Sequence, residues 1–289
     1  MQKKGIACAV LAAAFYALNA PFSKLLLGSV SPAMMAALLY LGAGFGMAVL
    51  QLAGKRRTPA LQQHRFTRKE LPYVIGMVVL DIAAPIALMV GITQTAAANV
   101  ALLNNFEIVA TSLIALLVFH ERISAKLWGG IVLVTLASIL LSVPDAADLS
   151  FSWGSVYVLI ACICWGMENN CTRMLSGGNP VQIVVVKGIG SGAGSLLVAL
   201  LAREAVPGIG AVALALLLGF VAYGLSIVFY IYAQRWLGAA KTSAYYAIAP
   251  FIGAGLSLLI FREAPSGMFL AALAVMIGGT YLVTVADAG

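Results

Sequence analysis

Apolar residues occur in long runs along almost the whole chain, and polar or charged residues gather in short stretches between these runs. A helix needs roughly 20 apolar residues to cross the hydrocarbon core of a bilayer. Gly, Pro or Ser marks many of the short connections, as is typical where helices end. The pattern predicts an all-α polytopic membrane protein with ten transmembrane helices, at residues 5–27, 32–53, 71–92, 96–119, 126–143, 153–174, 180–202, 208–233, 240–261 and 265–285.

Short sequence matches relate the first five predicted spans to the last five. Matching positions are separated by 148–149 residues in the early spans and by 142 in the later ones. We therefore expect two repeats of five helices, at residues 1–148 and 149–289. The matches are "YALNAPFSK" (16–24) with "WGMENNCTR" (165–173), "SPAMMAALLY" (31–40) with "NPVQIVVVKG" (179–188), and "FHERIS" (119–124) with "FREAPS" (261–266).

Each repeat contains an odd number of spans, so the second must insert upside down relative to the first. Inverted repeats are typical of secondary transporters, whose substrate site lies at the repeat interface near the midplane. A duplicated membrane enzyme or structural protein would show the same pattern, so the repeat alone leaves these classes open.

Composition and charge argue against two classes of protein, soluble globular domains and nucleic-acid-binding proteins. The chain is 62% hydrophobic and only 9% charged, whereas soluble domains contain about 25% charged residues. The net charge of +7 does not indicate nucleic-acid binding, because the basic residues lie mainly between the apolar runs.

The basic residues also predict an orientation, because Lys and Arg accumulate in cytoplasmic loops. With both termini in the cytoplasm, thirteen basic residues lie inside and two, Arg203 and Arg262, lie outside. The thirteen are Lys3, Lys4, Lys55, Arg56, Arg57, Arg65, Arg68, Lys69, Arg122, Lys126, Arg173, Arg235 and Lys241.

The chain resembles the drug/metabolite transporter superfamily in its ten-span EamA-type form. The features that carry the resemblance are an aromatic residue followed by Lys or Arg in spans one and six, Ser-Pro and Asn-Pro entries to spans two and seven, and Glu-Arg or Arg-Glu ends of spans four and nine. The resemblance implies solute export across a bacterial inner membrane, with the amino-acid exporter branch the most similar. It also implies a central cavity lined by spans 1, 3, 4, 6, 8 and 9.

One departure from the family pattern concerns the fourth span, "NVALLNNFEIVATSLIALLVF" (99–119). The family's proline is present in the ninth span as Pro250, but the matching residue here is Ile108, beside Glu107. A carboxylate at the centre of an inserted helix costs on the order of 2.5–3.5 kcal/mol. Asn104, Glu107 and Thr111 are spaced to share one helix face, which we expect to point into the bundle.

Other intramembrane polar and aromatic residues complete a predicted substrate site for an amino acid. Glu107 is expected to bind the ammonium, three asparagines the carboxylate, and aromatic rings the side chain. Asp81 in span three and Glu168 in span six add further carboxylates. The predicted substrate-binding residues are Asn19, Asp81, Asn104, Glu107, Trp165, Glu168, Asn169, Tyr245 and Tyr246.

Structural roles compete with these assignments. Asn19 and Asn169 could simply bond neighbouring helices, since interhelical hydrogen bonds contribute about 0.6–2 kcal/mol. Asp81 and Lys187 could form a buried ion pair, and Trp165 and Tyr245 could be packing residues.

No motif for a metal, a cofactor or nucleotide hydrolysis is present. The cysteines Cys8, Cys162, Cys164 and Cys171 fit no zinc spacing, and the glycine run at 188–194 lies inside a span and lacks the spacing of a phosphate-binding loop. We therefore expect no metal and no cofactor, and we expect no enzymatic activity.

The sequence predicts a secondary transporter or facilitator that exports small metabolites by alternating access, with amino acids as the leading substrate class, aromatic and other amphipathic ones included. Drug or nucleoside efflux is the alternative within transport. An intramembrane enzyme that uses Asp81 and Glu107 as paired carboxylates is the alternative from another class. The expected partners are a small-molecule substrate and the lipid bilayer. An intramembrane acid permits proton coupling, and the sequence leaves this coupling and the oligomeric state open.

Overall fold

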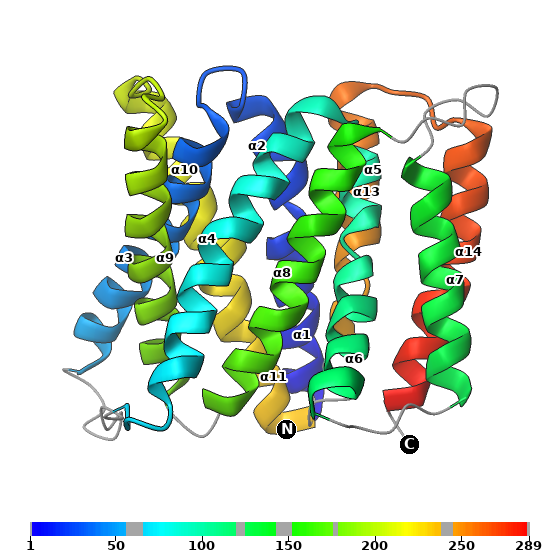
Figure 1. Ribbon diagram of the computed structural model, residues 1–289, viewed down its shortest axis with the longest axis horizontal. Coiled ribbons are helices and arrows are strands. Elements are labelled where there is room, and N and C mark those ends of the chain that lie inside the picture. The colour runs from blue at the N-terminus through cyan, green and yellow to red at the C-terminus, as the bar shows by residue number, and fades with distance from the viewer. Residues whose placement is uncertain are drawn as a thin grey trace.

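The computed structural model describes residues 2–55, 66–119, 125–142, 152–175, 179–237 and 245–287, and it is a bundle of roughly parallel and antiparallel helices (Figure 1). Each of the ten predicted spans is helical in these ranges, which contain no strand. The all-α polytopic prediction is therefore confirmed. The predicted repeat boundary at 148/149 and residues 120–124 of the "FHERIS" end of the fourth span lie outside the described residues.

Uninterrupted helices form six of the predicted spans over the described residues: α3 (Pro32–Lys55), α4 (Leu71–Gln94), α7 (Ala125–Ser142), α8 (Trp153–Leu175), α9 (Pro180–Leu201) and α14 (Gly267–Asp287). Shorter pieces form the others: α1 (Gln2–Ala17) with α2 (Asn19–Leu26), α5 (Ala97–Leu103) with α6 (Phe106–Phe119), α10 (Ile209–Gly219) with the π-helical turn η1 (Phe220–Leu225) and α11 (Ser226–Leu237), and α13 (Ala249–Phe261).

Six stretches are long and apolar enough to cross a membrane by themselves: Lys3–Leu26, Pro32–Leu52, Leu71–Gln94, Ala97–Val118, Pro180–Leu201 and Ile209–Tyr230. The apolar parts of α7, α13 and α14 are shorter. Large apolar side chains such as Leu117, Leu201 and Leu259 are strongly exposed on the outside of the bundle. This surface fits lipid as the surrounding solvent.

The Ser-Pro and Asn-Pro entries predicted from sequence begin α3 and α9. Asn179 caps α9, since its side chain accepts a hydrogen bond from the N–H of Val181 at 3.0 Å, and Pro180 occupies the first helical position. The N–H groups of Ala33 and Met34 at the start of α3 donate to the Glu204 carboxylate at 3.2 and 2.7 Å. A negative charge at this end also complements the helix dipole.

Four spans are interrupted near their middles. A turn at Leu18 separates α1 from α2, and turns at 104–105 and 247–248 occupy matching places in the fourth and ninth spans. The eighth span contains the π-helical turn η1. Interrupted helices expose backbone groups at the depth where transporters bind their substrates.

The break in the fourth span corrects one geometric assumption. The predicted face of Asn104, Glu107 and Thr111 supposed a continuous helix, but α5 ends at Leu103 and α6 begins at Phe106. Two successive asparagines favour this break because their side chains compete for backbone hydrogen bonds. Asn105 does so here, donating from Nδ2 to the carbonyl of Leu102 at 3.3 Å.

Equivalent helices of the two repeats make equivalent packing contacts. The equivalent helices α3 and α9 pack on each other, as do α7 and α14, and the contact of α4 with α8 has its counterpart in that of α11 with α1. The helices α3 and α9 run in opposite directions, and both chain ends lie at the same end of the bundle (Figure 1). The fold is therefore two inverted five-helix repeats, as the sequence predicts.

The crossing of α3 and α9 depends on two glycines. A Cβ atom placed on Gly188 would lie 2.5 Å from the backbone nitrogen of Gly44, and one placed on Gly44 would lie 2.7 Å from that of Ile189. Only glycine allows the two backbones to approach this closely.

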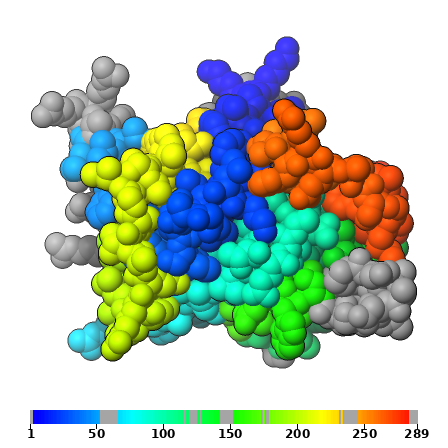
Figure 2. Space-filling model, turned by 90° about the horizontal axis from the view of Figure 1, so that it is seen from above, coloured from blue at the N-terminus to red at the C-terminus, as the bar shows by residue number. Residues whose placement is uncertain are grey.

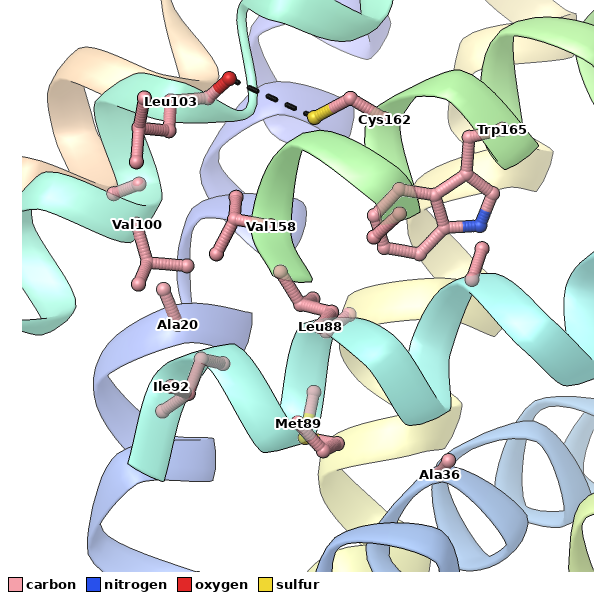
Figure 3. Close-up of a cluster of buried hydrophobic side chains, with 14 of the residues drawn as sticks. Ala20, Ala36, Leu88, Met89, Ile92, Val100, Leu103, Val158, Cys162 and Trp165 are labelled. Atoms are coloured by element: carbon pink, nitrogen blue, oxygen red, sulfur yellow. Dashed lines mark hydrogen bonds between the residues drawn. The ribbon is translucent and has the colours of Figure 1, made fainter. Parts of the chain in front are cut away.

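A buried apolar cluster holds α4, α5 and α8 together near the bundle's centre. Figure 3 shows Leu88, Val100 and Val158 among its members, and the thiol of Cys162 lies 3.6 Å from the carbonyl of Leu103. Every residue of α5 except Asn99 is buried, whereas the residues of α6 are mostly half-buried or exposed. The protein therefore encloses the α5 half of this span more completely than the α6 half.

The enclosed end is the one opposite the chain termini. There α2, α5 and α13 are in mutual contact. Figure 2 looks onto this end, where the blue, turquoise and orange parts of the chain lie side by side. Lys24 on α2 donates to the carbonyls of Ile92 and Thr95 at the end of α4, the latter at 3.1 Å. The lysine thus ties α2 to α4 at this end.

Candidate functional site

Glu107 lies in the first turn of α6, directly after the break in the fourth span. Its Oε1 accepts a hydrogen bond of 2.7 Å from Nδ2 of Asn169 on α8. Nδ2 of Asn169 is also 3.3 Å from the hydroxyl of Thr111, which itself donates to the Glu107 carbonyl at 2.8 Å. The site therefore joins one helix from each repeat, and all three side chains are half-buried.

Glu107 has no ion-pair partner among the residues that the structure describes. Its position at the start of α6 places the carboxylate at the positive end of a helix dipole, and the Asn169 amide supplies one donor. These contacts compensate only part of the cost of a membrane carboxylate. The site is therefore suited to receive a cationic group from a ligand.

An aromatic cluster of tyrosines lies beside Glu107. The ring of Tyr246 is 4.9 Å from that of Tyr230 and 5.9 Å from that of Tyr16, and Tyr16 in turn is 6.2 Å from Tyr223. The phenols of Tyr16, Tyr223 and Tyr246 lie within electrostatic range of the Glu107 carboxylate. Aromatic rings beside a carboxylate offer a surface for an apolar or aromatic ligand group and for a cation.

A second cluster is charged and more deeply buried. The ammonium of Lys187 on α9 lies 3.1 Å from Oδ2 of Asp81 and 2.9 Å from Oε2 of Glu168. Tyr40 donates to Oδ1 of Asp81 at 2.8 Å, and Nε1 of Trp165 donates to the Tyr40 hydroxyl at 3.4 Å. Both carboxylate side chains are at most 1% exposed, and that of Lys187 is 12% exposed.

A neutral pair occupies the corresponding place in the other half of the bundle. Nδ2 of Asn19 donates to the hydroxyl of Tyr223 at 3.1 Å, and Ser23 donates to Oδ1 of Asn19 at 3.0 Å. By the repeat offsets, Asn19 matches Glu168 and Tyr223 matches Asp81. The two repeats thus use the same two positions for different chemistry.

The predicted site residues therefore fall into separate groups. Glu107 and Asn169 are in direct contact and Tyr246 lies near them, whereas Asp81, Glu168 and Trp165 belong to the charged cluster. Asn19 belongs to the neutral pair. Asn104 lies buried at the helix break with its Oδ1 unpartnered, and Tyr245 is half-buried outside the ring contacts described above.

Sequence reasoning underestimated three residues of these clusters. Tyr40 was not singled out, although a phenol in the apolar run "MMAALLY" is itself a signal. Lys187 was expected at most to pair with Asp81, and the structure adds Glu168 as a second partner. Tyr223 is not among the predicted site residues, yet it contacts Asn19, Tyr16 and Tyr40.

The contacts do not support the paired carboxylates of the enzyme alternative. Asp81 is engaged by Lys187 and Tyr40, while Glu107 is engaged by Asn169. Within the described residues, no group of three His, Cys, Asp or Glu side chains is arranged to hold a metal ion.

Inverted five-helix repeats with interrupted helices and a polar site between them are typical of membrane transporters of small molecules. The sequence pattern of the EamA-like transporter family matches residues 3–143 and again residues 152–285. The chain belongs to this family, which is part of the drug/metabolite transporter superfamily.

Two further comparisons give a similar transporter sequence and a solved structure with a similar fold. An uncharacterized transporter of Methanothermobacter thermautotrophicus is 24% identical in an alignment of 302 positions. The alignment covers 95% of this chain and 84% of that protein. A solved crystal structure is similar in fold, with a TM-score of 0.71 and 17% identity, over 99% of this chain and 97% of the other.

Proposed function

We propose that this transporter exports amino acids and that Glu107 and Asn169 bind the substrate's ammonium and carboxylate groups. The observation that carries the proposal is the contact of Glu107 with Asn169 at 2.7 Å, without an ion pair for the carboxylate among the described residues. An arriving ammonium would give Glu107 its missing counter-charge. The freed Asn169 amide could then donate to the substrate carboxylate.

The tyrosine cluster supports amphipathic substrates. Tyr16, Tyr230 and Tyr246 form a continuous set of ring contacts next to Glu107. Such a wall accommodates an aromatic or long apolar side chain without demanding one shape. The same wall would accept a planar drug or nucleoside, so these compounds belong in the substrate panel.

Transport would proceed by alternating access, as the two repeats rock about the site. Glu107 lies on α6 of the first repeat and Asn169 on α8 of the second, so a relative movement of the repeats changes their separation. Closure at the end opposite the termini, where Lys24 ties α2 to α4, fits a conformation open toward the other end.

We propose that the protein lies in a bacterial inner membrane, as the family resemblance implies, and that both termini are in the cytoplasm, as the basic residues counted above favour. A cysteine at Gln62, in a variant without the native cysteines, should resist a membrane-impermeant thiol reagent in intact cells. A cysteine at Ser29, in the α2–α3 turn, should react. The reverse result would contradict this orientation.

The test of function is efflux from proteoliposomes. Vesicles loaded with single radiolabelled amino acids, a nucleoside or a cationic dye should release the amino acids faster when they contain the protein. Chromatography of the released label should show unmodified substrate. Release of the nucleoside or dye but of no amino acid would establish the alternative substrate class, and a modified product would point to an enzyme.

A further inference from the structure

We propose that the cluster of Asp81, Glu168 and Lys187 is a proton-binding site, separate from the substrate site at Glu107. The proposal concerns which ion this transporter binds, and the proton site itself does not depend on the identity of the substrate.

The charge count of the cluster is the first argument. Two carboxylates share a single ammonium, at 3.1 Å from Asp81 and 2.9 Å from Glu168. If both acids were ionised, one negative charge would remain uncompensated among side chains that are almost fully buried. A surplus charge at this depth is strongly unfavourable. One proton bound to either carboxylate makes the cluster neutral without moving a side chain.

Among the described residues, the groups near the cluster provide no second cation. Several helices contribute a titratable or polar group, and Lys187 is the only base among these described residues. The groups are Tyr40 on α3, Glu107 on α6, Glu168, Cys171 and Thr172 on α8, and Tyr223 in η1. Two of the hydroxyls already donate to the carboxylates, Tyr40 to Asp81 and Thr172 to Glu168. Hydroxyl donors stabilise a charge but do not cancel it.

The neutral pair of Asn19 and Tyr223 supplies the second argument, because the repeat relates its positions to those of the charged cluster. Asn19 and Tyr223 occupy the positions of Glu168 and Asp81 and bond directly at 3.1 Å. Leu39, which is fully buried, occupies the position of Lys187. At the equivalent place between α2 and η1, a neutral hydrogen bond is therefore sufficient. The charged version is not needed for packing, which favours a role in binding an ion.

The shared ammonium explains how a single proton could be exchanged. Two carboxylates that share one site take up and release protons as a pair, and Lys187 can remain with whichever acid is ionised. The cluster joins α4 of the first repeat with α8 and α9 of the second. A rocking movement that separates Asp81 from Lys187 would change the affinity for the proton. The site could thereby couple export to a proton gradient.

The test is infrared difference spectroscopy of the purified protein in lipid nanodiscs, without substrate. Spectra recorded at stepped pH values through neutrality should contain the C=O band of one protonated carboxylic acid in the wild type. The band should be lost in Asp81→Asn and equally in Glu168→Gln, because each variant leaves one carboxylate balanced by Lys187. It should remain in Glu107→Gln and in Tyr223→Phe, which changes the neutral counterpart of Asp81.

The outcomes separate this proposal from its rivals. Absence of the band from the wild type would overturn it, as would loss of the band in Glu107→Gln alone. Persistence of the band in both Asp81→Asn and Glu168→Gln would place the proton elsewhere. Because the two substitutions test the same balance, one folded variant is sufficient if the other does not fold. Failure of amino-acid efflux would reject the proposed substrate while leaving this spectroscopic result intact.

Discussion

Replacement of Lys187 by methionine tests how the charged cluster stabilises the fold. The substitution keeps an unbranched side chain but leaves Asp81 and Glu168 without their only cation among the described residues. Removing one partner from a buried ion pair costs about 3–5 kcal/mol. We therefore expect Lys187→Met to lower the free energy of unfolding by that amount, which reduces the ratio of folded to unfolded protein about a hundredfold or more.

Reversible unfolding in mixed micelles with increasing dodecyl sulfate would measure this difference. The expected loss should shrink as the pH falls, since a protonated carboxyl has no charge to leave unpaired. The triple variant Asp81→Asn/Glu168→Gln/Lys187→Met should recover most of the stability, because neutral groups in place of a buried ion pair are often tolerated.

A matched control is available at the equivalent position of the first repeat. Leu39 is fully buried, and Leu39→Met keeps the volume nearly constant, so a loss below about 1.5 kcal/mol is expected. A loss for Lys187→Met no greater than that for Leu39→Met, at neutral pH, would refute the idea that Lys187 balances the negative charge of the Asp81–Glu168 cluster.

Two further predictions concern the aromatic wall and the helix crossing. Tyr246→Ala should weaken efflux of aromatic amino acids more than that of alanine, while Tyr246→Phe, which keeps the ring contacts to Tyr16 and Tyr230, should stay near wild type; an equal loss for all substrates would indicate a purely structural ring. Gly188→Val should prevent normal folding, because its side chain would meet the backbone of Gly44. Gly255→Val, where a Cβ meets nothing within 4 Å, should fold normally, and size-exclusion profiles in detergent would compare the two.

The sequence was sufficient to predict the spans and their inverted arrangement. Both follow from the length of the apolar runs and from matches such as "YALNAPFSK" with "WGMENNCTR", which need no knowledge of tertiary contacts. The pairing of Asp81 with Lys187 was one of the alternatives that the sequence allowed, since two opposite charges inside a membrane are expected to meet.

Other features depended on tertiary structure. The break at residues 104–105 could not be separated from a continuous helix, because asparagine tolerates both and the outcome depends on packing. Glu168 and Asn169 are adjacent in sequence, and nothing local indicates that one contacts Lys187 and the other Glu107. Neighbouring residues on a helix point in directions about 100° apart, so the choice of partner is set by which helices pack on either side of α8.

Equilibrium binding to Glu107→Gln is the most direct test of the proposed substrate site. The wild type should bind an amino acid more tightly than the same compound with its ammonium replaced by hydrogen. Hydrogen bonds to charged groups contribute about 1.5–3 kcal/mol, so the expected preference is roughly 10- to 150-fold. In Glu107→Gln this preference should fall to near unity while affinity for the deaminated analogue is kept. A folded Glu107→Gln protein that retains the wild-type preference would contradict the assignment of Glu107 as the partner of the substrate ammonium.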